Sequence, residues 1–238
     1  MAEQNKINYP LISVIVPSMG RDTLVRTIQS ILNSCYPNLE ILVSASGDGV
    51  TGIASKLNFP YVKLVWWESQ KVSPAKAKNE ALKHAKGKYV TFIDDDDTCY
   101  PAKFFNLSKH LEDNPETFGA FGQYNVRDCS SGNIKNRNCG GGVPVNFKTL
   151  LKTNYIASGS IMLRNKEAVY FDETLPHGWG EDYKLWLKLV AKYRIDFVPV
   201  VVYAWTQNVK SGFTSWLKNW RELTKNIQEE AKTKYGTL

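Results

Sequence analysis

Four consecutive aspartates, Asp94 to Asp97, directly follow the apolar segment YVTFI at residues 89–93. Carboxylates this close repel one another, so folding alone gives no reason to gather them. One interpretation is an acidic loop that is simply solvated. The other is a site for Mg²⁺ or Mn²⁺, because these cations take carboxylate oxygens together with water and substrate phosphates. A bound cation would relieve the repulsion and would attract a diphosphate.

Alternating strands and helices are predicted to position these aspartates. Ser73 and Pro74 supply an N-cap and a first helical residue, and Gly87 ends the helix that they begin. Short apolar segments rich in β-branched residues predict buried strands. The order βαββαβ indicates an α/β sandwich, a Rossmann-like α/β/α arrangement around a mostly parallel central sheet. The strands are predicted at residues 11–17, 40–44, 61–67 and 89–93.

Three polar segments follow predicted strands. They are the turn SMGRD at residues 18–22, the loop SASGDG at 44–49 and the aspartates at 94–97. In sheets of this kind, ligands bind beyond the carboxyl ends of the strands. We therefore expect the three segments to meet in one crevice.

The second half of the chain is less regular. Residues 1–206 are expected to form one domain, and residues 207–238 a helical tail that packs on or beside it. Within the domain we predict a long loop or hairpin tip at residues 128–144 and a helix that begins near Glu181. Further elements are a helix at 101–113 and strands at 158–164 and 195–205.

The net charge of +7, from 30 Lys and Arg against 23 Asp and Glu, suits an anionic partner or a solvated surface. The absence of an apolar stretch long enough for a bilayer, of an apolar N-terminal segment and of paired cysteines predicts a cytoplasmic protein. The tail helix with Trp216 and Trp220 either packs on the domain or makes peripheral contact with the inner face of a membrane.

The segments SVIVPSMGR, EILVSASGDG, AKAKNEALKHAKGKYVTFIDDDD and GWGEDYKLWLKL occur in this order and together resemble the family 2 glycosyltransferases, which have the GT-A fold. The resemblance covers residues 11–206. It implies an inverting enzyme that moves a sugar from a nucleotide-sugar donor to a hydroxyl acceptor, such as a glycan or a lipid-linked sugar. It also implies a divalent cation, Mn²⁺ or Mg²⁺, that assists departure of the nucleoside diphosphate.

The same resemblance implies roles for individual residues. Asp182 would be the general base beside Glu181, although a lone acidic pair there would also simply complement the helix dipole. Asp96 and Asp94 would be the metal ligands. Trp179 would either stack on a sugar or belong to the core. The nucleotide-sugar contacts implied are Pro17, Ser18, Arg21, Ser46, Asp48, Lys78, Asn79, Asp94, Asp95 and Trp179.

Three departures from the family pattern stand out. Residues 45–48, Ala-Ser-Gly-Asp, replace the usual Asp-Asp-Gly-Ser, and Lys78 replaces an arginine. Residues 205–208, Trp-Thr-Gln-Asn, lack the histidine that many relatives have near this point. The first departure leaves the nucleobase open: uridine is the family default, with guanosine and cytidine as alternatives. Three other interpretations also stay open. They are a non-catalytic module that binds nucleotide or sugar, a sugar nucleotidyltransferase, and a transferase whose acceptor is nucleic acid.

Overall fold

The structure is a computed structural model that describes residues 9–48, 52–128, 131–137, 144–175, 180–207 and 213–236. Its strands are β1 (Ile12–Ser18), β2 (Leu39–Ser46), β3 (Val62–Glu68), β4 (Tyr89–Phe92), β5 (Thr98–Cys99), β6 (Gly119–Asp128), β7 (Ile134–Arg137), β8 (Ile161–Arg164) and β9 (Ile195–Gln207). Its helices are α1 (Thr23–Leu32), α2 (Ile53–Lys56), α3 (Pro74–Leu82), α4 (Ala102–Asp113), α5 (Phe147–Leu150), α6 (Glu181–Val190) and α7 (Phe213–Tyr235), with a 3₁₀ turn, η2, at Ser158–Ser160.

The described strands form one sheet in the order β3-β2-β1-β4-β8-β6-β9-β5, with β7 paired to β6. The first four strands in this order are parallel, as the βαββαβ pattern predicts. Beyond β4 the directions are mixed: β8 is antiparallel to both β4 and β6, whereas β6 and β9 are parallel. The predicted α/β sandwich is therefore confirmed, and its regular parallel part is the half that carries the aspartates.

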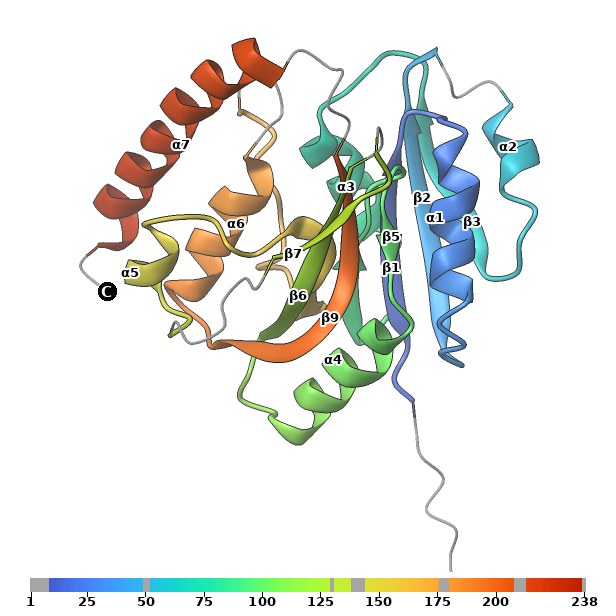
Figure 1. Cartoon of the computed structure of the whole chain (residues 1–238). Coiled ribbons are helices and arrows are strands. Elements are labelled where there is room, and N and C mark those ends of the chain that lie inside the picture. Colours follow the sequence, from blue (N-terminus) through green and yellow to red (C-terminus); the bar gives the residue numbers. More distant parts are fainter. Residues whose placement is uncertain are drawn as a thin grey trace, which may run out of the picture.

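Helices cover both faces of the sheet (Figure 1). Every residue of β1 is buried, and its side chains alternate between two apolar clusters. Val14 and Val16 pack in the cluster that contains α1 and α4, whereas Ile15 packs in the one that contains α3 and α6. This explains why apolar residues in β1 point to both faces, with the buried Ser13 hydroxyl donating a hydrogen bond to Glu40.

Local signals set the helices that border the site. The Ser73 hydroxyl accepts a hydrogen bond from the backbone N–H of Lys76 at 3.2 Å, and Pro74 is the first residue of α3. Gly180, with φ of 80°, precedes α6 in the left-handed region, where a residue without Cβ is favoured. Both helices therefore begin where the sequence predicts.

The 128–144 segment includes part of a hairpin. β6 and β7 pair in antiparallel register from Tyr124 opposite Arg137 to Arg127 opposite Ile134. Residues 129–130 and 138–143 lie outside the described residues.

The C-terminal helix α7 lies beside α6 (Figure 1). Ile227 and Ala231 are buried in the same apolar cluster as α6, and Glu230 forms an ion pair with Lys184 at 2.6 Å. The side chains of Trp216 and Trp220 are not among those that the structure describes. Within the described ranges, no helix combines the length and the apolar character needed to cross a membrane.

Candidate active site

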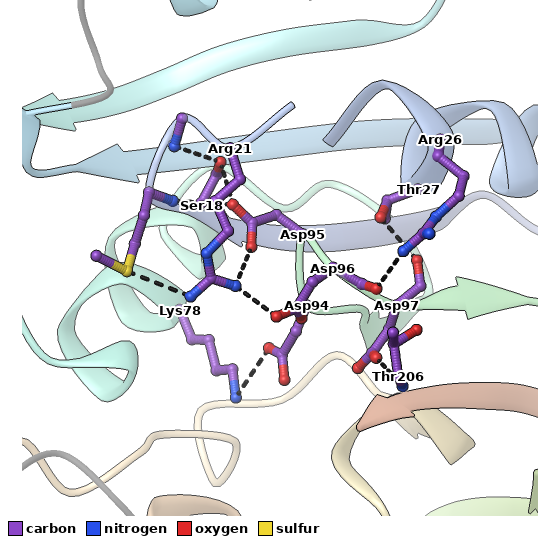
Figure 2. Close-up of polar contacts among 12 residues, drawn as sticks. Ser18, Arg21, Arg26, Thr27, Lys78, Asp94, Asp95, Asp96, Asp97 and Thr206 are labelled. Atoms are coloured by element: carbon purple, nitrogen blue, oxygen red, sulfur yellow. Dashed lines mark hydrogen bonds and ion pairs between the residues drawn. The ribbon is translucent and has the colours of Figure 1, made fainter. Parts of the chain in front are cut away.

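The turn after β1 and the aspartate turn after β4 meet, as expected from the parallel pairing of these strands. Asp95 joins them, because its carboxylate accepts hydrogen bonds from the Ser18 hydroxyl at 2.7 Å and from the backbone N–H of Met19 at 3.0 Å. Arg21 adds an ion pair to Asp95 at 3.0 Å (Figure 2). The Asp95 side chain is only 4% exposed, so it is an internal anchor of the turn.

Asp97 is a second anchor, directed toward β9. It is 1% exposed, and it accepts hydrogen bonds from the Tyr203 hydroxyl and from the backbone N–H of Thr206 at 2.6 Å. Burial raises the pKa of Asp97 well above its ordinary value, and the neighbouring aspartates add to this shift. Tyr203 packs directly on the η2 turn, where a Cβ on Gly159 would overlap its ring.

These partners were not predicted from the sequence. Tyr203 and Thr206 lie more than 100 residues from Asp97, in a strand where they look like ordinary positions. Thr27, whose hydroxyl donates to the Asp97 carbonyl at 2.7 Å, is buried in α1 and was equally missed. No local pattern marks any of the three.

Asp94 and Asp96 alternate with the two anchors and have partly exposed side chains, at 42% and 40%. The Asp96 carboxylate contacts Arg21 at 2.5 Å, and its backbone carbonyl accepts a hydrogen bond from Arg26 at 2.6 Å (Figure 2). Burial raises the pKa of Asp96 above its ordinary value, and Arg21 opposes this shift. In the turn, Asp94 and Asp96 thus point outward, whereas Asp95 and Asp97 are buried and hold the turn in place.

These two carboxylates fit a divalent cation of the Mg²⁺ or Mn²⁺ type. Such ions are commonly held by one or two carboxylates and completed by water and substrate phosphates. No group of three or more His, Cys, Asp or Glu side chains within the described ranges is arranged to hold a metal ion. With these two carboxylates as ligands, the remaining positions around such a cation would be left to water and to the phosphates of a substrate.

Lys78, on α3, connects the aspartate turn to the start of α6. Its ammonium nitrogen lies 2.8 Å from a carboxylate oxygen of Glu181 and 3.7 Å from one of Asp94, and 3.3 Å from the hydroxyl of Ser158 in η2. The Lys78 side chain is only 2% exposed. Burial by itself lowers its pKa, but the neighbouring carboxylates outweigh burial and raise it. Lys78 is therefore charged, and it is a buried counter-ion for Glu181 and for the more exposed Asp94.

Asp182 lies beside this ion pair in the first turn of α6. It is partly exposed, and its carboxylate accepts a hydrogen bond from the backbone N–H of Tyr183 at 2.6 Å. Burial raises the pKa of Asp182 to about 7, with a further contribution from the charge of Glu181, while Lys78 opposes the shift. A carboxylate with this pKa is suited to accept a proton near neutral pH.

The other residues predicted to contact the nucleotide-sugar lie in different environments. Asn79 is directed elsewhere: its amide exchanges hydrogen bonds at 2.9 Å with the backbone of Phe171, so it holds that segment and not the carboxylate cluster. Pro17 is buried within β1, and Ser46 is buried with its hydroxyl 3.4 Å from the Val72 N–H. Asp48 is exposed beyond β2, and Trp179 lies outside the described residues.

Comparison with known sequences finds one family over most of this region. The profile described as "Glycosyl transferase family 2" matches residues 13–171. The Escherichia coli protein named UDP-Glc:alpha-D-GlcNAc-diphosphoundecaprenol beta-1,3-glucosyltransferase WfaP is 28% identical over 190 residues, which are 76% of this chain and 71% of the relative. An uncharacterized glycosyltransferase of Rickettsia bellii is 28% identical over 90% of this chain but only 31% of its own length.

Solved structures share the fold. TarS 1-349 of S. aureus superposes with a TM-score of 0.66 at 21% identity, over 82% of this chain and 60% of the TarS chain. The same protein in complex with UDP-GlcNAc gives a TM-score of 0.66 at 20% identity, over 86% of this chain and 61% of that one. The chain thus spans about three fifths of the TarS fragment and about a third of the Rickettsia relative.

Proposed function

The chain belongs to glycosyl transferase family 2, whose profile matches about two thirds of it, and from this premise we propose that it is an inverting glycosyltransferase. Its donor would be a nucleotide-sugar bound at the aspartate turn. Its acceptor would be a hydroxyl group that approaches the first turn of α6. The observation that carries the proposal is the bridge formed by Lys78, which holds Asp94 and Glu181 within reach of one side chain.

In this proposal, the Lys78 bridge supports a leaving-group site and a base that lie next to each other. An inverting transfer needs a leaving diphosphate on one face of the sugar and a base on the opposite face. In this proposal, Asp94 and Asp96 would hold the divalent cation, which would neutralise the charge of the leaving diphosphate. Asp182 takes the proton from the acceptor oxygen as that oxygen attacks the anomeric carbon. The raised pKa of Asp182, about 7, allows this carboxylate to accept the proton and to return it to solvent near neutral pH.

Glu181 and Lys78 have a positioning role in this scheme. Their 2.8 Å ion pair fixes the start of α6 against α3, and the Lys78 charge opposes the rise in the pKa of Asp182. Lys78 is too deeply buried to reach far into solvent, so it acts on the site mainly through the carboxylates that it contacts. In this proposal Lys78 therefore positions other residues, whereas the family resemblance implies that it contacts the nucleotide-sugar directly.

We propose UDP as the nucleotide of the donor and a lipid-linked sugar as the acceptor. One support is WfaP, which matches this chain over 76% of this chain and 71% of its own length and is named for a UDP-glucose donor and a diphosphoundecaprenol acceptor. The other is that TarS was solved in complex with UDP-GlcNAc. The missing Asp-Asp pair at residues 45–48 is the reason to test other nucleobases as well. Peripheral contact with a membrane surface would suit such an acceptor, whereas nothing in the described residues favours nucleic acid.

The first test is calorimetric titration of UDP, GDP, CDP and dTDP into the full chain, each with and without Mn²⁺. We expect one nucleotide to bind in a strongly cation-dependent way, with UDP the strongest. A nucleotide-sugar of that base should then be consumed when a hydroxyl acceptor is supplied. Binding without any turnover would favour a non-catalytic module, and the absence of binding by all four would overturn the donor assignment.

A further inference from the structure

Arg21 forms an ion pair with Asp96, one of the two carboxylates that would hold the divalent cation. One guanidinium nitrogen, Nη1, lies 3.0 Å from an oxygen of Asp95 and 2.5 Å from an oxygen of Asp96 (Figure 2). We propose that Arg21 holds the Asp96 carboxylate in the cation-free protein and gives it up when cation and nucleotide diphosphate bind together. This inference rests on the proposed function, and it assigns to Arg21 a coupling role that a simple donor contact would not have.

The two bonds of Arg21 differ in what their loss would leave behind. The Asp95 carboxylate is buried but keeps two other donors, Ser18 and the Met19 backbone, so the turn after β1 stays fixed without Arg21. The Asp96 side chain is 40% exposed, so water or a cation can replace the guanidinium there. The bond to Asp96 is therefore the one that can open without breaking the turn.

A cation and Arg21 cannot share this carboxylate without cost. A Mg²⁺-sized ion binds a carboxylate oxygen at about 2.1 Å, close to the atom that now lies beside Nη1. A cation and a guanidinium that both contact the same carboxylate oxygen repel each other, so cation binding favours displacement of the guanidinium. The Arg21 side chain is 44% exposed and has room to turn outward.

A diphosphate changes the balance. Guanidinium groups bind phosphate oxygens through parallel hydrogen bonds, so a nucleotide beside Asp96 offers the displaced Arg21 a new partner. The cation would then bind tightly only when the nucleotide is present. Because coupling between two ligands is reciprocal, the nucleotide would also bind tightly only with the cation.

Arg26 provides a matched control. It carries the same charge and contacts the same aspartate, but it donates to the backbone carbonyl of Asp96 at 2.6 Å and not to the carboxylate. If Arg21 acted only as a nearby positive charge, removal of Arg26 should have a similar effect. If it competes for the carboxylate, only the removal of Arg21 should free the site.

The experiment is titration of MnCl₂ into the wild-type chain, Arg21→Ala and Arg26→Ala, each with and without saturating UDP. Removal of a competing charge-assisted hydrogen bond should tighten Mn²⁺ binding to Arg21→Ala without nucleotide by about tenfold. Arg26→Ala should stay within about threefold of wild type. The gain in Mn²⁺ affinity caused by UDP should be several-fold smaller in Arg21→Ala than in wild type.

The inference would be overturned if Mn²⁺ bound wild type and Arg21→Ala with equal affinity in the absence of UDP. It would also be overturned if Arg21→Ala and Arg26→Ala tightened Mn²⁺ binding by the same factor relative to wild type. If Arg21→Ala lowers the unfolding midpoint, Arg21→Gln repeats the test with a neutral side chain of similar length. The Mn²⁺ titration alone decides the competition, whereas failure of the wild type to bind any nucleoside diphosphate counts against the proposed function. The two failures are therefore distinguishable.

Discussion

The aspartate turn after β4 and the acidic pair at the start of α6 carry similar charge but are held in different ways. The turn receives hydrogen bonds from β1, α1 and β9, which anchor Asp95 and Asp97 from opposite sides. Glu181, by contrast, has an ion pair with one buried lysine, and Asp182 has a hydrogen bond from the next backbone N–H. The aspartate turn is fixed by several hydrogen bonds, whereas the acidic pair depends on the charge of one lysine, Lys78.

This difference suits the two proposed tasks. A site for a cation and a diphosphate needs carboxylates at fixed positions, and a base needs a pKa near the working pH. Several donors fix the position of the turn, although burial still raises the pKa of its anchor Asp97 well above the ordinary value. Burial also raises the pKa of Asp182, to about 7, and the charge of Lys78 opposes that rise. The comparison yields four predictions, which test whether the functions divide in this way.

The largest effect is expected for Asp182→Asn. Loss of the proton acceptor should lower the transfer rate by about 10³-fold, while cation-dependent binding of the donor nucleotide should change less than about twofold. Turnover assays and calorimetry measure the two quantities separately. Glu230→Gln removes a carboxylate on α7, outside the site, and should leave both unchanged. Transfer by Asp182→Asn at close to the wild-type rate would show that another group is the base.

Lys78→Met should affect stability and pH dependence together. Removal of the buried cation leaves Glu181 uncompensated, so the free energy of unfolding should fall by about 3 kcal/mol in denaturant titration.

The same lysine should set the pH profile. Because the base acts in its ionised form, the wild-type rate should rise with pH through about 7, the pKa of Asp182. Lys78 opposes the rise of that pKa, so in Lys78→Met the rising limb should move to higher pH. An unchanged pH profile in a folded Lys78→Met variant would show that Lys78 does not influence the pKa of the base.

Asp97→Ala tests the anchored side of the turn. The Tyr203 hydroxyl and the Thr206 N–H would lose a buried acceptor, which should lower the free energy of unfolding by about 2 kcal/mol. Tyr203→Phe removes one of the two donors and should cost less. If the alanine variant is as stable as wild type, Asp97 is not a structural anchor.

The smallest effect on stability is expected for Asp94→Asn. Its side chain is 42% exposed, so the free energy of unfolding should change by less than about 0.5 kcal/mol. Nucleotide affinity with Mn²⁺, however, should fall by at least about tenfold. A stability loss as large as that of Asp97→Ala would contradict the division of the turn into two anchors and two ligands.

Much of the fold was predictable because its first half is regular. The apolar strand segments, the Ser73 cap and the start of α6 at Glu181 are local signals, and all appear in the structure. The pairing of β4 with β8, and of β6 with both β8 and β9, was not predicted, because periodicity along one strand does not identify its neighbours.

The candidate site was predictable only in part, for two physical reasons. Four identical aspartates give no local indication of which are buried, so the alternation of Asp95 and Asp97 with Asp94 and Asp96 needs the structure. The Lys78–Glu181 pair joins residues 103 apart in the sequence, and such contacts leave no trace in either segment. Asn79 shows the reverse case, in which a motif match predicted a donor contact but the amide holds Phe171.

The hydrogen bond from Tyr203 to Asp97 also bears on the order in which the protein matures. A ribosome makes the aspartate turn about a hundred residues before it makes β9. Until then the turn lacks one of its anchors, and contacts across long loops form late because closing them costs chain entropy. We therefore expect nascent chains that end before β9 to bind no nucleotide, so that competence for catalysis arrives in one late step of synthesis.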